Sequence, residues 1–142
     1  MSDCPECRAL ADPATDVLLR TTRYAVHPVV GGGAVPGWLV VAPLRHVEAI
    51  DRLDPGEQVE LGPLLARVGA ALRAATPAEK LYVNVFAEVV PHLHVHLIAR
   101  PPELAPERRG ARLFLDPARA QPAEVARVAA AVRQALGGSA TG

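Results

Sequence analysis

Two stretches of the chain repeat apolar residues at the spacing of an α-helix. In residues 54–75 these positions recur every three or four residues and form one stripe, made of Leu61, Leu64, Leu65, Val68 and Leu72. Asp54 precedes the stripe, Pro55 fits the first helical position, and Glu57 lies where a capping box needs it. Residues 122–136 carry a second apolar face. The pattern therefore predicts two main helices.

Shorter segments show the alternating or continuous apolar pattern of β-strands. They are 21–27, 38–42, 81–86, 92–99 and a short edge strand at 112–115. Because 81–86 and 92–99 are separated by a short connection, we expect them to form an antiparallel hairpin. The pattern also allows a short helix at 12–19, with Asp12 as its N-cap. Together these elements predict an α+β domain, an antiparallel sheet of about five strands with helices on one side.

The segment at 92–98 carries an unusual polar pattern, since it reads His-Leu-His-Val-His-Leu-Ile. Strand alternation places His92, His94 and His96 on one face and the apolar residues in the core. A neutral imidazole can act as a nucleophile, a base or a metal ligand. The outer two histidines are about 13 Å apart along a strand, so one zinc ion could bind an adjacent pair at most. We therefore expect different roles for the three rings, against the alternative of merely hydrogen-bonded structural histidines.

Length and charge narrow the class of protein. The chain has 142 residues with 15 basic and 15 acidic side chains, which predicts a single domain over 1–142 with a frayed tail at 137–142. The zero net charge argues against a nucleic-acid partner, although a small nucleotide needs only a few local donors. No apolar run approaches a membrane span and the N-terminus does not resemble a signal peptide, so we expect no membrane partner and a cytoplasmic location.

The two cysteines of the chain, Cys4 and Cys7, form a Cys-x-x-Cys pair near the N-terminus. In a reducing compartment such a pair is typical of a metal clip or a redox pair rather than a structural disulfide. We expect residues 1–11 to form this clip. The alternative is a pair of free thiols on a flexible terminus.

Two motifs resemble one known family. The run His-φ-His-φ-His-φ-φ, where φ is apolar, is similar to the signature of the histidine triad (HIT) superfamily of nucleotide hydrolases and transferases, and Arg100 follows it. Residues 36–46, Pro-Gly-Trp-Leu-Val-Val-Ala-Pro-Leu-Arg-His, resemble the upstream strand and loop of the same superfamily. The resemblance extends over about residues 4–100. It implies an antiparallel α+β fold and a homodimer.

The resemblance also implies a zinc site. Several branches of the superfamily join an N-terminal Cys-x-x-Cys to two histidines, at positions that correspond here to Cys4, Cys7, His46 and His92. Four protein ligands leave no open position on a tetrahedral ion, so we expect the zinc to be structural.

The catalytic roles follow from the resemblance as well. It implies that His94 is the nucleophile, which attacks the α-phosphate of a dinucleoside polyphosphate or nucleoside phosphoramidate to form a covalent nucleotidyl-histidine. It implies that His96 contacts the phosphate oxygens or assists the leaving group. Asn84 is a candidate phosphate contact, or else a solvent-facing or turn-supporting residue. No organic cofactor is expected.

This chain departs from the superfamily pattern in three places. Residues 87–91, Ala-Glu-Val-Val-Pro, replace a Gly-Gln-Ser/Thr stretch, so Val89 lacks the usual hydroxyl and Glu88 adds a negative charge. His27 stands where a ribose-binding acid is expected, and either replaces it or is an ordinary loop residue. Trp38 replaces a histidine, which we interpret as a packing change. These departures keep two other hypotheses open. One is a non-catalytic, zinc-stabilised nucleotide-binding module. The other is a catalytic metal on His94 and His96, which we favour less because the sequence offers no carboxylate close by.

Overall fold

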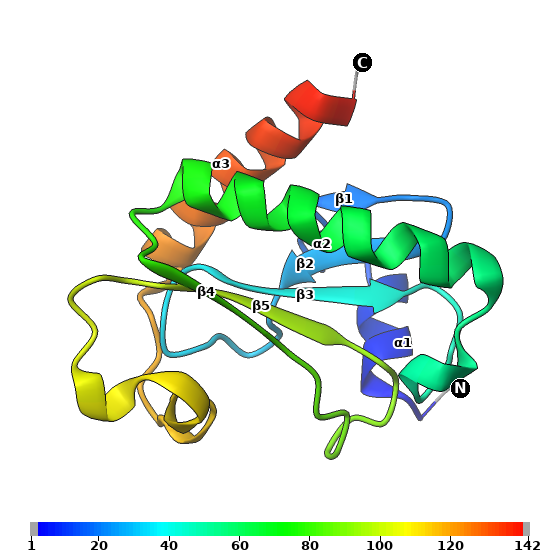
Figure 1. Cartoon of the computed structure of the whole chain (residues 1–142), viewed down its shortest axis with the longest axis horizontal. Helices are drawn as coiled ribbons and strands as arrows, with labels where there is room; N and C mark the ends of the chain where they lie inside the picture. The colour runs from blue at the N-terminus through cyan, green and yellow to red at the C-terminus, as the bar shows by residue number, and fades with distance from the viewer. Residues whose placement is uncertain (1–2, 141–142) are drawn as a thin grey trace.

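The computed structural model describes residues 3–140, and within them five strands form one antiparallel sheet in the order β1-β2-β3-β5-β4 (Figure 1). All neighbouring strands are antiparallel, as predicted for the fold class. The strands are β1 (Leu19–Arg20), β2 (Tyr24–Pro28), β3 (Trp38–Pro43), β4 (Lys80–Asn84) and β5 (Val95–Arg100).

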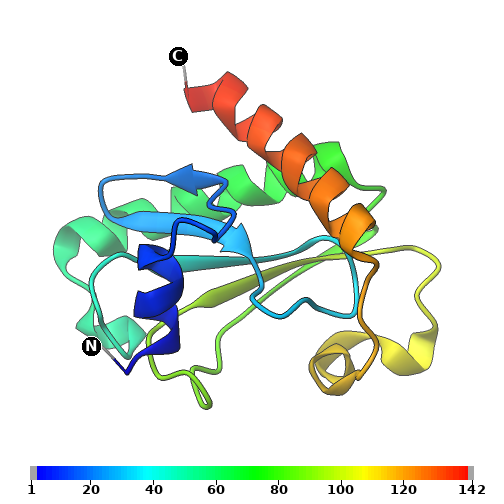
Figure 2. The same ribbon diagram turned by 180° about the vertical axis from the view of Figure 1, so that it is seen from behind.

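Two helices cover one face of this sheet, α2 (Pro55–Ala75) and α3 (Pro122–Ala140) (Figures 1 and 2). The predicted capping box is confirmed at the start of α2, where the side chain and backbone of Asp54 and Glu57 exchange two hydrogen bonds of 2.8 Å. The main core lies between these helices and the sheet, and includes Leu64, Val68, Leu72, Leu93, Val95, Leu97, Val128, Val132 and Leu136. The helix α3 continues past the predicted start of the frayed tail, and residues 141–142 lie outside the described chain.

The opposite face of the sheet carries a second apolar cluster. Trp38 and Ile98 point away from α2, because side chains alternate along β3 and β5, and they pack with Leu113 and Leu104. The predicted edge strand at 112–115 is wrong. This segment belongs to a 3₁₀ helix, η3 (Gly110–Leu115), preceded by η2 (Pro106–Arg108). The burial of Leu113 against the sheet decides its conformation, and a four-residue apolar run cannot reveal that contact.

The predicted helix at 12–19 is also wrong. The first helix is α1 (Pro5–Ala11), with Cys4 as its N-cap and Asp12 as its C-cap. The side chain of Asp12 accepts a hydrogen bond from the backbone N–H of Ala14 at 2.8 Å, which makes a local turn that competes with a helix. The residue before Pro13 is also sterically disfavoured in a helical conformation. Asp12 therefore terminates a helix instead of starting one.

The histidine segment enters the sheet later than predicted. The strand β4 ends at Asn84 and β5 begins at Val95, so His92 and His94 lie just before the ladder. The two strands are antiparallel neighbours as predicted, but residues 85–94 connect them. Within this connection Ala87 has a φ of 51°, in the left-handed region. An alanine thus keeps the backbone conformation that glycine adopts most easily.

We expect Ala87→Gly to raise the free energy of unfolding by about 0.5–1 kcal/mol, because it removes the steric cost of a left-handed alanine. Chemical denaturation of both proteins measures the effect. The matched control is Ala130→Gly, an exposed position inside α3, which should lose about 1 kcal/mol. A loss of equal size at both positions would contradict the assigned conformation of Ala87.

None of the helices in residues 3–140 combines the length and the apolar character that crossing a membrane requires.

Candidate functional site

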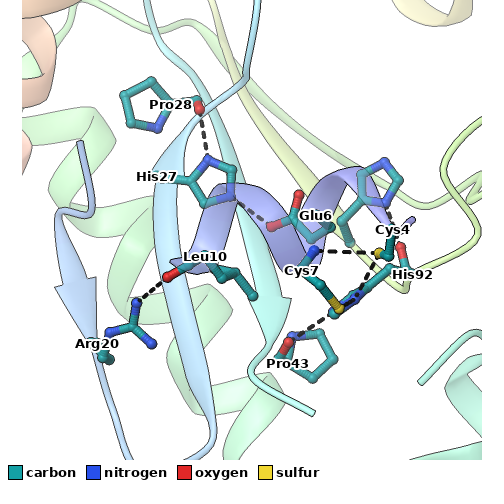
Figure 3. A network of polar contacts seen from close by, with 10 residues as sticks. Cys4, Glu6, Cys7, Leu10, Arg20, His27, Pro28, Pro43 and His92 are labelled. Carbon is teal, nitrogen blue, oxygen red and sulfur yellow. Dashed lines mark hydrogen bonds and ion pairs between the residues drawn. The ribbon is translucent and has the colours of Figure 1, made fainter. Parts of the chain in front are cut away.

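Four side chains from distant parts of the sequence meet at one end of the sheet. Figure 3 shows three of them, Cys4, Cys7 and His92. Cys4 and Cys7 come from the start of α1, His46 from the loop after β3, and His92 from the segment before β5. Their ligand atoms all lie within 4.8 Å of one another. The Sγ of Cys7 is 3.4 Å from the Nδ1 atoms of both histidines, and the Sγ of Cys4 is 3.5 Å from Nδ1 of His92. The structure therefore brings together the four residues predicted as metal ligands.

Hydrogen bonds on the far side of each ring orient these histidines. The Nε2–H of His92 donates to the carbonyl oxygen of Pro43 at 2.9 Å. The Nε2 of His46 lies 2.8 Å from a carboxylate oxygen of Glu48. Burial lowers the pKa of His92, so its ring is neutral and Nδ1 carries a lone pair. Such outer partners are characteristic of metal-binding histidines.

The donor set fits a tetrahedral metal ion. Zinc binds thiolate sulfur at about 2.3 Å and imidazole nitrogen at about 2.0–2.1 Å, which gives a nitrogen–sulfur separation of about 3.5 Å across a tetrahedron. The observed nitrogen–sulfur distances of 3.4–3.5 Å match this value. Two cysteines and two histidines are also a donor set that zinc uses in closed sites.

The other two histidines of the segment lie side by side with different tautomers. The Nδ1–H of His94 donates to the carbonyl oxygen of His92 at 2.7 Å, since a carbonyl can only accept, and this leaves a lone pair on Nε2. The indole N–H of Trp38 donates to Nδ1 of His96 at 3.0 Å, which places the proton of His96 on Nε2. The two ring centroids are 4.9 Å apart. The pair thus offers one nucleophilic nitrogen beside one hydrogen-bond donor.

The interpretation of Trp38 as a packing change alone is incomplete, because its indole N–H also donates a hydrogen bond to His96. Its ring packs edge-on against Phe114 at 5.0 Å, and Phe114 lies 5.2 Å from the ring of His96. The hydrogen bond from Trp38 to His96 spans 58 positions in the sequence. The sequence places both residues on predicted strands, but only the pairing of β3 with β5 shows that they meet.

Burial and the neighbouring His94 lower the pKa of His96 to about 4. In the unfolded chain its pKa is about 6.5, so between these two values the unfolded state binds a proton that the folded state excludes. This residue therefore withdraws stability as the pH falls from about 6.5 towards 4. We expect an NMR titration of the imidazole nitrogens to show His96 neutral with the proton on Nε2 down to about pH 4. Titration of His96 near pH 6.5 would contradict the burial and the Trp38 contact.

Two cavities share His94 and His96. The larger one, of about 490 Å³, lies between residues 86–90 and residues 111–115. The smaller one, of about 140 Å³, extends towards α1 and β2 and reaches Glu6 and His27. The histidine pair therefore lies between two cavities whose other lining residues differ, one mainly apolar and one with a buried acidic residue.

His27 is an interior residue rather than a loop residue, and it forms an ion pair with Glu6 of α1 (Figure 3). Its Nε2–H donates to Oε1 of Glu6 at 2.7 Å and its Nδ1–H to the carbonyl of Pro28 at 2.8 Å. Burial alone would lower the pKa of His27, but the hydrogen bond to Glu6, the negative charge of that carboxylate and the bond to the Pro28 carbonyl together raise the pKa. Sequence reasoning missed Glu6, although a charged residue between two clip cysteines was a signal. The carboxylate of Glu6 lies in the same cavity as the histidine pair.

Asn84 lies opposite His96 in the ladder between β4 and β5. Its Oδ1 atom is buried without a hydrogen-bond partner among the described residues. The side chain lines a separate cavity with Tyr82 and Phe114, and it is not among the described residues that line the two histidine cavities. The structure thus places Asn84 beside the site and leaves its role as a phosphate contact a prediction.

The chain matches the family model of the HIT domain over residues 21–103. Among solved structures, it resembles a histidine triad protein from Bradyrhizobium japonicum, with 28% identity, a TM-score of 0.71, and coverage of 89% of this chain and 92% of the other. A histidine triad (HIT) protein from Sinorhizobium meliloti is 26% identical, with a TM-score of 0.69 and coverage of 83% and 87%.

A zinc-bound histidine triad family protein from Mycobacterium smegmatis shares the fold at 17% identity, with a TM-score of 0.67 and coverage of 99% and 97%. No match is found among curated proteins. The family model covers more than half of the chain, including the whole histidine segment. The chain therefore belongs to the histidine triad (HIT) family, which is associated in general with nucleotide-related hydrolase and transferase activity.

Proposed function

We propose that the chain is a nucleotide hydrolase that uses His94 as its nucleophile on the α-phosphate of a dinucleoside polyphosphate or a nucleoside phosphoramidate. The observation that carries this proposal is the fixed pair of tautomers. The bond to the His92 carbonyl leaves Nε2 of His94 with a lone pair, and the bond from Trp38 leaves Nε2 of His96 with a proton. A lone pair beside a donor suits attack on a phosphorus whose oxygens gain charge.

The proposed reaction has two steps. In the first, Nε2 of His94 forms a bond to phosphorus while the bond from phosphorus to the leaving group breaks. The leaving group departs with the electron pair and takes up a proton from solvent, and the Nε2–H of His96 donates a hydrogen bond to a phosphate oxygen. In the second step water attacks phosphorus, the bond to Nε2 breaks, and the proton of the water is released. The products are a nucleoside monophosphate and neutral His94. An acceptor other than water would make the protein a nucleotidyl transferase, which we favour less.

We further propose that Cys4, Cys7, His46 and His92 hold a structural zinc. The support is the match of donor types and distances described above. Bound there, the metal would supply a fixed link between α1, the loop after β3 and the segment that carries His94. All steps proposed for substrate use side chains outside this cluster, and none requires an organic cofactor.

The partner that we propose is a small nucleotide, with neither nucleic acid nor membrane, in keeping with the zero net charge, and with a cytoplasmic location. We also propose a homodimer. The strand β4 is an edge of the sheet, and Val83 on it is 53% exposed. Exposed edges with apolar side chains favour pairing with another chain. Light scattering should give twice the mass of the chain at micromolar concentration, and a single-chain mass would contradict the dimer.

The function is tested by a panel of adenosine and guanosine dinucleotides and phosphoramidates, assayed in H₂¹⁸O with and without a mild chelator. We expect a nucleoside monophosphate that carries one ¹⁸O atom, formed at the same rate with and without the chelator. Nucleotide binding without turnover would favour the non-catalytic module. Turnover that disappears with the chelator and returns with added metal would favour a catalytic metal, which Glu6 could help to bind in the smaller cavity.

A further inference from the structure

The larger cavity beside the histidine pair has an apolar wall. Phe86, Val89 and Val90 form one side, and Phe114 and Leu115 form the other. The rings of Phe86 and Phe114 meet edge-on with centroids 5.1 Å apart. Val89 is 94% exposed and Leu115 is 85% exposed, so apolar side chains also surround the opening. Apolar surface that is kept exposed around a cavity indicates a site that binds an apolar group.

The acidic side chain that lines the larger cavity has no basic partner in the lining of either cavity among the described residues. Among the described residues that line the larger cavity, Glu88 is the only acidic or basic one apart from His94 and His96. The smaller cavity contains Glu6, which is neutralised by His27. Neither lining includes a lysine or an arginine among the described residues. A polyphosphate leaving group carries several negative charges and is normally bound by Lys, Arg or a metal ion.

The two cavities also differ in what they offer a nucleoside. Ribose hydroxyls need hydrogen-bonding partners, and the carboxylate of the buried Glu6 supplies an acceptor in the smaller cavity, where both N–H groups of His27 are already committed. The larger cavity contains no comparable buried polar pair among its described lining residues. The polar lining therefore favours the smaller cavity for the ribose, which assigns the larger one to the group on the other side of the phosphorus.

We propose, on the basis of the proposed function, that the larger cavity selects an apolar leaving group without negative charge, and that Glu88 is a specificity-determining residue. A nucleoside phosphoramidate of a hydrophobic amine is a substrate of this class. The amine leaves in neutral form and takes up a second proton from solvent near neutral pH, as a lysine side chain does, so Glu88 stabilises the ammonium product in the cavity. The same carboxylate repels a leaving group that carries a carboxylate or a phosphate.

The test uses two adenosine 5′-phosphoramidates that differ by one carboxylate, those of 2-phenylethylamine and of phenylalanine, with diadenosine triphosphate as the polyphosphate. We expect wild-type kcat/KM to favour the phenylethylamine compound over both others by about tenfold or more, the effect of one unfavourable charge at short range. In Glu88→Gln the ratio between the two phosphoramidates should narrow at least threefold. In the matched control Glu103→Gln, an exposed glutamate that lines a different cavity, the ratio should not change.

Binding to His94→Ala separates this inference from the chemistry, since that variant should leave both phosphoramidates uncleaved. Calorimetry with this variant should show tighter binding of the phenylethylamine compound than of the phenylalanine compound. Adding Glu88→Gln to this variant should reduce the difference between the two affinities. Equal ratios with and without Glu88, or a preference for the polyphosphate, would overturn the assignment of the larger cavity. The expected order of affinity without any turnover by wild type would contradict the proposed hydrolysis alone.

Discussion

The variant His94→Ala should lose at least about four orders of magnitude of kcat/KM, because loss of the nucleophile removes the covalent route entirely. Water would then have to attack the phosphorus directly, with the remaining contacts as the only source of rate enhancement. The structure gives this residue a prepared role, since its Nδ1–H is committed to the His92 carbonyl. Steady-state assays with the best substrate of the panel, which quantify the released nucleoside monophosphate, measure the loss.

Two comparisons make this result specific to the nucleophile. The variant His96→Ala should lose about 10²–10³ in kcat, the usual effect of removing one donor to a developing charge. Metal content and far-ultraviolet circular dichroism should show that His94→Ala folds normally, because His94 is outside the metal cluster. Activity of His94→Ala within tenfold of the wild type would show that another group attacks the phosphorus.

The second large effect is expected at the metal cluster. The variant Cys7→Ser should lose zinc and unfold at a temperature about 10 °C lower. Metal binding to a site that the unfolded chain lacks contributes directly to folding, and a loss of about 3 kcal/mol corresponds to roughly 10 °C for a chain of this size. The cluster joins α1 to His46 and His92, so its loss leaves Glu6 and His27 as the main polar link between α1 and the sheet. Calorimetric scans measure the shift.

Zinc reconstitution supplies the control for this variant. Apo wild-type protein should regain the higher unfolding temperature when zinc is added, whereas Cys7→Ser should not respond. Elemental analysis of tag-free protein should give one zinc per chain. Absence of zinc from the wild type, or unchanged metal content in Cys7→Ser, would contradict a metal site at this cluster.

Local signals in the sequence were sufficient for most of the fold. The capping box at Asp54 and Glu57 is made by residues three positions apart, so its signal is complete in the sequence. The predictions failed where a distant contact decides the conformation. The segment 112–115 becomes helical because Leu113 packs against Trp38 and Ile98, and the helix at the N-terminus is shifted towards the two cysteines.

The candidate site shows the same division. The resemblance to the histidine triad superfamily implied a set of four metal ligands, Cys4, Cys7, His46 and His92, and the structure brings these four residues together. The bond between Glu6 and His27 and the bond between Trp38 and His96 join positions 21 and 58 residues apart. Neither pairing follows from the pattern of a single segment, because each depends on which strands and helices become neighbours. The tautomers of His94 and His96 likewise became apparent only with the three-dimensional contacts.

The covalent intermediate is the most direct test of the account. Wild-type protein mixed with substrate, quenched within milliseconds near neutral pH and measured by intact-mass spectrometry, should carry one nucleoside monophosphate. The adduct should be absent from His94→Ala, and peptide mapping should place it on residue 94. Rapid turnover of the same substrate with no adduct at any quench time, or an adduct of equal amount in His94→Ala, would contradict catalysis by His94.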